Sequence, residues 1–205
     1  MKQFFAVGLL LISASVVLGQ TDYASAHAQA ACTLTLAQSP DVSGLRLGMK
    51  PDEVLALFPG SRADKEVRTD MLTPASRLGV STLTIKPGRY ASKAKFPRVS
   101  AITLMLLDGR VITVNVSYDG PRYGHVDEFL GKFIEGKKLP AVHAWEAYVG
   151  MDAQLKSLNC RGFEIKVFAG GKNVRDINYV ELTDVAARKR IRDRRAKTAG
   201  KNSTG

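Results

Sequence analysis

The alternation of apolar and polar residues predicts six β-strands from residue 80 onward. They are expected at residues 80–85, 99–107, 111–118, 154–160, 163–169 and 174–182. Asp108-Gly109, between two apolar runs, is a strong hairpin signal, and Gly170-Gly171 suits the turn between the last two strands. In the strand at 111–118 we expect one face to carry Ile112, Val114, Val116 and Tyr118. Thr113, Asn115 and Ser117 fall on the other face, which should be lightly covered.

Helical patterns precede each set of three strands. Pro51 and the two acids after it favour a short helix that ends at Pro59-Gly60. Apolar residues at i, i+3, i+4, i+7 and i+8 predict a second helix over about 125–135. Thr183 or Asp184 can cap a final, basic helix.

This order of elements predicts an α+β fold of two α-β-β-β units. Short helices would pack the antiparallel sheet or sheets, and a basic C-terminal helix would follow. The expected division is a leader at 1–30, a first unit at 31–120, a second unit at 121–183 and a basic helix or tail at 184–205.

The first thirty residues have the pattern of a secretory signal peptide. Lys2 precedes an apolar run at 4–18, and small residues then offer cleavage after Ala26, Ala28 or Ala30. An uncleaved membrane anchor is the alternative, but the run is shorter than the roughly 20 apolar residues of a spanning helix. Lipidation at Cys32 is not expected, because Gln29 stands where a lipobox has an aliphatic residue. We therefore expect an exported protein, periplasmic or secreted.

The chain contains two cysteines, Cys32 and Cys160. In an oxidising compartment they predict one disulfide, with two unrelated buried thiols as the alternative. The bridge would close a loop of 128 residues, which the chain-entropy model values at about 4–5 kcal/mol. Two lone cysteines without clustered histidines make a poor metal site, so we expect no metal and no cofactor.

Positive charge is concentrated near the C-terminus. Eight Lys and Arg residues fall between 188 and 201 against one acid, Asp193, so this segment supplies +7 of the net charge of +11. A basic segment can bind nucleic acid or an anionic surface. Export argues against nucleic acid, which leaves a solvated tail, an acidic partner, or anionic lipid or lipopolysaccharide. The candidate residues for an anionic surface are Arg188, Lys189, Arg190, Arg192, Arg194, Arg195 and Lys197.

The segment 44–54 resembles the Gly-Met-Thr-x-x-Glu/Gln-Val opening of the SmpA/OmlA family and of β-lactamase-inhibitor-protein-like domains. Gly48, Met49, Glu53 and Val54 match, whereas Lys50 replaces the Thr that would cap the helix, at a cost on the order of 1 kcal/mol. The resemblance implies a sheet packed on a short helix and binding of other proteins through a sheet face. It implies no particular target.

Candidate catalytic residues are few. The chain has no G-x-S-x-G, P-loop or G-x-G-x-x-G pattern, and His125 and His143 lack a metal-binding spacing. A cysteine hydrolase with Cys160 as nucleophile and His143 as base is the remaining enzyme hypothesis. Because the expected disulfide opposes it, we expect a protein that is not an enzyme.

The resulting hypothesis is an exported protein-binding module of the cell envelope or secretome. The alternatives are association with the envelope surface through the basic tail, and a secreted enzyme inhibitor. The sheet face at Thr113, Asn115 and Ser117 and the loop 86–97 are candidate contact surfaces. The candidate anchors for a protein partner are Arg89, Tyr90, Phe96, Trp145 and Tyr148, since Tyr, Trp and Arg commonly anchor interfaces. Core packing is the alternative role for Trp145 and Tyr90. The sequence indicates no oligomeric state.

Overall fold

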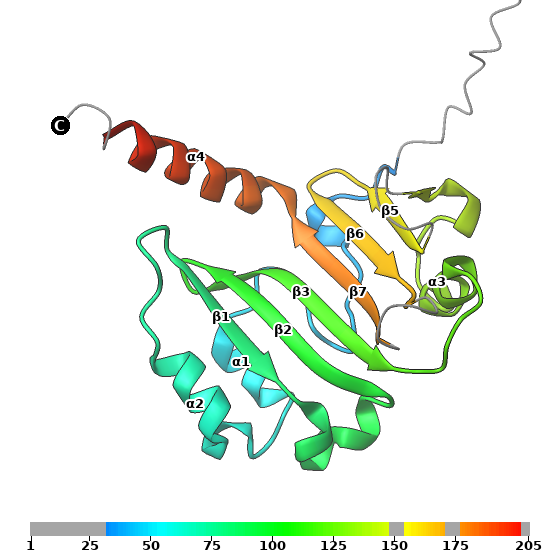
Figure 1. Cartoon of the computed structure of the whole chain (residues 1–205), viewed down its shortest axis with the longest axis horizontal. Helices are drawn as coiled ribbons and strands as arrows, with labels where there is room; N and C mark the ends of the chain where they lie inside the picture. Colours follow the sequence, from blue (N-terminus) through cyan, green and yellow to red (C-terminus); the bar gives the residue numbers. More distant parts are fainter. Residues whose placement is uncertain (1–31, 148–153, 171–176, 202–205) are drawn as a thin grey trace, which may run out of the picture.

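Two antiparallel meanders, the first of three strands and the second of four, join edge to edge into one sheet (Figure 1). The structure, a computed structural model, describes residues 32–147, 154–170 and 177–201. The strands are β1 (Val80–Ile85), β2 (Val99–Leu107), β3 (Arg110–Asp119), β4 (Glu146–Ala147), β5 (Leu155–Asn159), β6 (Phe163–Phe168) and β7 (Ile177–Asp184). Their order is β1-β2-β3-β7-β6-β5-β4, with β3 and β7 paired at the centre. The predicted α+β class is confirmed, and the strands of both expected units lie in a single sheet.

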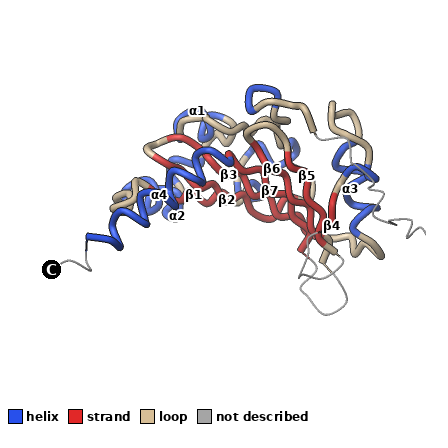
Figure 2. The backbone as a smooth tube through the Cα atoms, turned by 90° about the horizontal axis from the view of Figure 1, so that it is seen from above, coloured by secondary structure: helices blue, strands red, loops and turns tan. Residues whose placement is uncertain are grey.

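The helices are α1 (Pro51–Ala56), α2 (Lys65–Leu72), α3 (Val126–Ile134) and α4 (Val185–Lys201). α1 and α3 pack on one face of the sheet, here named the core face. Fully buried side chains from both helices and from three strands meet there: Val54, Leu130, Leu104, Val114 and Ile165. Figure 1 looks onto the opposite side, here named the open face, and Figure 2 shows α1 on the far side of the strands.

The start of α1 is fixed by hydrogen bonds to β3 and by its own third residue. Gly48 adopts φ +84°, and its N–H donates to the Val111 carbonyl at 2.7 Å. Because Lys50 has no side-chain acceptor, the Glu53 carboxylate accepts from the Lys50 N–H at 2.6 Å instead. The Gly48-Met49 step thereby ties α1 to the sheet.

A second helix, α2, lies in the segment 61–78, where the sequence suggested no element. Asp64 caps it by accepting a hydrogen bond from the Glu66 N–H at 2.8 Å. Its large apolar residues are Val67, Met71 and Leu72, of which only Val67 is buried. Periodicity did not predict this helix, because its eight residues are fewer than the roughly 11–18 over which a helical period is read.

The alternation in β3 is interrupted near its start. The β2–β3 register shifts between Met105 and Leu106. As a result Val111 joins the main core, whereas Ile112 packs in a separate small cluster with residues of α4. The simple alternation predicted Ile112 on the same side as Val114 and Val116, and that prediction is wrong.

α4 is docked on the end of the sheet and is not a free tail. Asp184 caps it, accepting a hydrogen bond from the Ala187 N–H at 2.8 Å. Ala187 and Ile191 are buried against Leu107 and Ile112. Figure 1 shows the helix running from the end of β7 past the ends of the first meander.

The predicted disulfide between Cys32 and Cys160 is present and joins residues 128 positions apart. It ties the start of the described chain to the end of β5, where Thr35 also forms a β-bridge with Arg161. Such a bridge fits an exported protein. Among the described residues, none of the helices is both long and apolar enough to cross a membrane. The segment 1–30, predicted as a signal peptide, lies outside the described residues.

Candidate functional site

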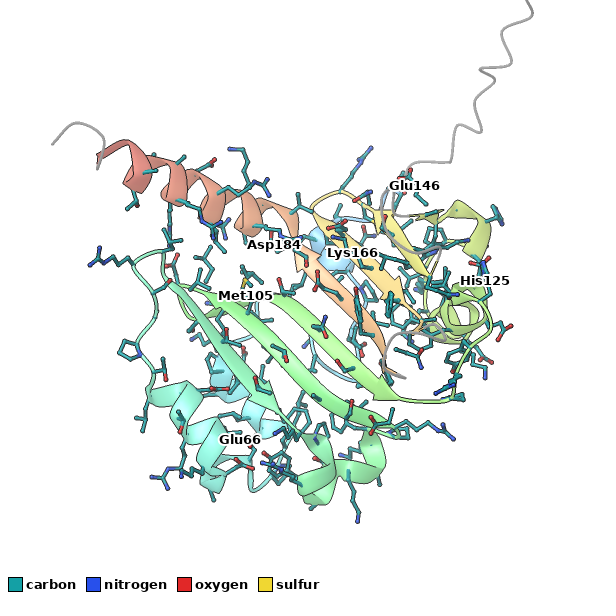
Figure 3. The ribbon with its side chains drawn as sticks, viewed as in Figure 1. Glu66, Met105, His125, Glu146, Lys166 and Asp184 are labelled. Atoms are coloured by element: carbon teal, nitrogen blue, oxygen red, sulfur yellow. A yellow bond between two sulfur atoms is a disulfide. The ribbon has the colours of Figure 1, made fainter. Side chains whose placement is uncertain are left out.

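A row of polar residues crosses the open face from one edge of the sheet to the other. The strand registers place these residues side by side: Thr84, Thr103, Asn115, Glu181, Lys166, Ser157 and Glu146. Asn115 donates from Nδ2 to Glu181 Oε2 at 3.3 Å, and Lys166 Nζ lies 3.5 Å from Glu164 Oε1. Figure 3 shows the side chain of Lys166 among others on this face.

The predicted face residues Thr113, Asn115 and Ser117 are all half-buried, whereas their neighbours Val114 and Val116 are fully buried. The prediction of one lightly covered face is therefore confirmed for β3. Thr113 and Thr183 bring their hydroxyls within 3.5 Å across the central pair of strands. The result is a polar surface whose side chains are held in place by one another.

One end of the open face is aromatic. Phe168 and Tyr179 are opposite each other on β6 and β7, with ring centroids 5.1 Å apart and planes inclined by 18°. Burial, together with the nearby Glu181 carboxylate, raises the pKa of Tyr179. The phenol therefore stays protonated at neutral pH and can donate a hydrogen bond.

The loop 86–97 does not present its aromatic residues to solvent. Tyr90 and Phe96 are only 8% and 5% exposed. Both rings pack on Phe58, with centroid separations of 6.4 and 4.6 Å. Their prediction as partner-binding anchors is therefore wrong, because the core uses their surface.

Arg89 and the Tyr90 hydroxyl hold the same loop to α2. The hydroxyl donates to Asp64 Oδ2 at 3.1 Å, and Arg89 Nη1 lies 3.3 Å from that oxygen and 3.2 Å from Glu66 Oε2. The Glu66 N–H, the Tyr90 hydroxyl and Arg89 lower the pKa of Asp64. Burial and the bond to Asp64 raise the pKa of Tyr90 to about 12. Arg89 is thus engaged within the molecule.

Trp145 is also part of the core. It is 2% exposed, and its Nε1–H donates to the Pro140 carbonyl at 3.1 Å. The alternative of core packing is the correct one for this residue, and its role as a partner anchor is wrong. Tyr148, the remaining aromatic candidate, lies outside the described residues.

The basic residues of α4 fall into two groups. Arg194 forms a bidentate pair with Asp108, at 2.9 and 2.6 Å, and also donates to the Leu78 carbonyl at 2.7 Å. Lys189 pairs with Asp193, and Arg188 lies 3.7 Å from Glu164. The other predicted anionic-surface residues are exposed and have no acidic partner within 4 Å among the described residues: Arg190, Arg192, Arg195 and Lys197.

Between α4 and the open face lies a groove of about 580 Å³, here named the α4 groove. It is lined by Ser76, Leu78, Val80, Met105, Arg188, Ile191, Arg192 and Arg195. Figure 3 shows Met105 on the sheet close to α4. The sequence did not indicate this site, although Ala187 and Ile191, four residues apart in a basic run, could have signalled that α4 packs on the sheet.

The chemistry that the described residues offer is recognition by charge, hydrogen bonding and apolar contact. Cys160 is committed to the disulfide, so it cannot act as the nucleophile of a cysteine hydrolase. Across the described ranges, no three His, Cys, Asp or Glu side chains converge as a metal site.

Comparison with known proteins adds little to this description. No family model matches the chain, and no curated protein matches it. A crystal structure of a cysteine-rich secretory protein from Staphylococcus aureus subsp. aureus Mu50 is similar, with a TM-score of 0.38 and 8% identity. The similarity covers 75% of this chain and 51% of that one, so this chain spans about half of that protein's length. A likeness at this level carries no argument about function.

Proposed function

We propose that this protein is an exported, non-enzymatic binding module that contacts a protein partner through the open face of its sheet. The observation that carries the proposal is the polar row through Asn115, Glu181 and Lys166, which spans all seven strands. Figure 1 shows α4 running beside this face at one end of the sheet.

The composition of the face supports recognition of a protein. Tyr179 supplies a flat ring with a hydroxyl donor, and Glu164, Lys166 and Glu181 supply both signs of charge. Interfaces combine such aromatic surface with a polar rim. Side-chain hydrogen bonds within the face, such as Asn115 to Glu181, reduce the conformational entropy that binding would cost. The export of the module, periplasmic or secreted, is part of the proposal and rests on the leader pattern and the disulfide.

Site-directed photo-crosslinking in the native envelope and culture medium tests this assignment. A photo-reactive residue replaces Thr113 or Ser117 on the open face, and Ala56, an exposed residue of α1 on the core-face side, serves as the control. The proposal expects one partner to be captured from both open-face positions and not from Ala56. Capture from Ala56 alone, or equal capture from all three positions, would contradict it.

A second candidate function is association with an anionic envelope surface. It is favoured by four exposed cations of α4 that have no acidic group within 4 Å in the described ranges, namely Arg190, Arg192, Arg195 and Lys197. Binding to vesicles containing phosphatidylglycerol should then fall steeply with salt, because exposed charges are screened over about 8–10 Å.

A secreted enzyme inhibitor is the remaining alternative. It would be favoured if the partner captured by crosslinking is an enzyme, and an assay of that enzyme with and without this protein would test the inhibition.

A further inference from the structure

We propose that the α4 groove binds one anionic amphiphile as a monomer: an apolar chain that ends in a carboxylate or phosphate. Its volume of about 580 Å³ lies within the roughly 300–1,000 Å³ of pockets that hold small ligands. Two features of its lining, an apolar floor and a row of arginines, correspond to the two parts of such a molecule.

The apolar floor comes from three elements of the fold. Val80 and Met105 project from β1 and β2, Leu78 precedes β1, and Ile191 projects from α4. Met105 is 39% exposed, so its side chain offers apolar surface to the groove. The flexible thioether of methionine adapts to ligands of irregular shape. An apolar chain in the groove would remove this surface from water.

The arginine row comes from a single stripe of α4. Arg188, Arg192 and Arg195 stand at i, i+4 and i+7, on the side of the helix that lines the groove. Arg188 already has Glu164 within 3.7 Å, whereas Arg192 and Arg195 have no acidic partner within 4 Å in the described part of the chain. Guanidinium groups form paired hydrogen bonds with carboxylates and phosphates. The head of the ligand therefore belongs at Arg192 and Arg195.

The backbone around the groove argues against a peptide as the ligand. The Val80 N–H and carbonyl both bond to Ser76, at 3.2 and 2.8 Å, and the Leu78 carbonyl accepts from Arg194 at 2.7 Å. A peptide backbone placed here would lose its hydration without gaining these partners, which is costly. An acyl chain has no polar groups to satisfy, so the groove suits it better.

The packing of α4 argues against insertion of this helix into a bilayer. A helix that lies in a membrane surface needs a free apolar face. The two buried apolar residues of α4, Ala187 and Ile191, instead pack against Leu107 and Ile112 of the sheet. Leu78, Val80 and Met105 line the groove, where a single apolar chain can reach them.

Calorimetric titration of the exported protein with laurate, kept below its micelle concentration, tests the proposal. We expect saturable binding of one laurate per chain and no binding of the neutral analogue dodecanol at matched concentration. The double variant Arg192→Gln/Arg195→Gln should bind laurate at least about tenfold more weakly, because it loses the charged hydrogen bonds. Met105→Glu should abolish binding by placing a carboxylate on the floor.

The matched control is Arg190→Gln/Lys197→Gln, which removes the same charge from the same helix outside the groove. It should bind laurate as the unchanged protein does, and circular dichroism should show that all variants are folded. Equal weakening in both double variants would overturn the proposal, because it would indicate general attraction to a basic helix. Failure of laurate to bind, whether or not phosphatidylglycerol vesicles bind, would also overturn it.

Discussion

The side chain of Tyr90 joins two parts of the molecule. Its ring packs on Phe58, and its hydroxyl donates to the Asp64 carboxylate that caps α2. The loop 86–97 is thereby fixed to the helix on one side and to the core on the other. The hydroxyl and the ring contribute separately to the stability of the fold, because the hydroxyl forms a hydrogen bond and the ring makes apolar contacts.

Replacement Tyr90→Phe should lower the free energy of unfolding by about 1.5–3 kcal/mol, the usual net value of a hydrogen bond to a charged group. The ring packing on Phe58 is retained. Tyr123→Phe is the control, because Tyr123 packs on Phe129 and its hydroxyl has no hydrogen-bond partner among the described residues. Urea unfolding of both variants measures the difference, and equal effects would show that the Tyr90 hydroxyl contributes nothing.

Gly79 lies beneath the ion pair that holds α4. It adopts φ +77°, and an added Cβ would come within 2.7 Å of Arg194 Nη1 and closer still to Asp108 Oδ1. Gly79→Ala should therefore lower the free energy of unfolding by more than roughly 1–2 kcal/mol, which is the cost of placing an alanine in the left-handed backbone region. Gly109→Ala is the matched control, with φ +73° and no atom within 4 Å of its Cβ. Equal destabilisation by the two substitutions in urea would contradict the predicted displacement of the ion pair.

At the scale of elements, α4 is held to the first meander by few contacts. Ala187 and Ile191 supply the apolar part, and the Arg194–Asp108 pair supplies the polar part at the far end. The hydrogen bond from Arg194 lowers the pKa of Asp108 below its ordinary value of 3.8. A carboxyl whose pKa is lowered in the folded state stabilises that state only while it is ionised.

The contribution of this pair should therefore depend on pH. It is fully present above the unfolded-state pKa of about 3.8, and it is lost as the pH falls through the lowered folded-state pKa. Asp108→Asn should lower the midpoint of thermal unfolding at pH 7 and have little effect at pH 2. Asp52→Asn, which removes an exposed carboxylate from a surface pair with Arg62, serves as a control for general charge effects. A constant difference between Asp108→Asn and the unchanged protein across this range would contradict the argument.

At the scale of the whole molecule, the sheet was predictable and the site on it was only partly so. β1 and β2 match their predicted bounds because alternation and the Asp108-Gly109 turn are local signals. β4 has only two residues, too few to show alternation in the sequence. It is recognised as a strand only because it pairs with β5. The α4 groove depends on Arg194 reaching Asp108, 86 positions earlier in the chain. No local pattern encodes that contact, just as none encodes the burial of Tyr90 against Phe58.

The disulfide acts on the molecule as a whole, because Cys32 and Cys160 lie 128 positions apart and both helices on the core face lie between them. Joining them restricts the unfolded chain far more than it changes the folded one. The double variant Cys32→Ala/Cys160→Ala should therefore be less stable to urea by about 2–5 kcal/mol. A reductant should destabilise the unchanged protein by a similar amount and leave the double variant unaffected. If the reductant changes neither protein and both thiols of the unchanged protein react with a thiol label before unfolding, the bridge does not form in solution. Stability would then rest on the shared core alone.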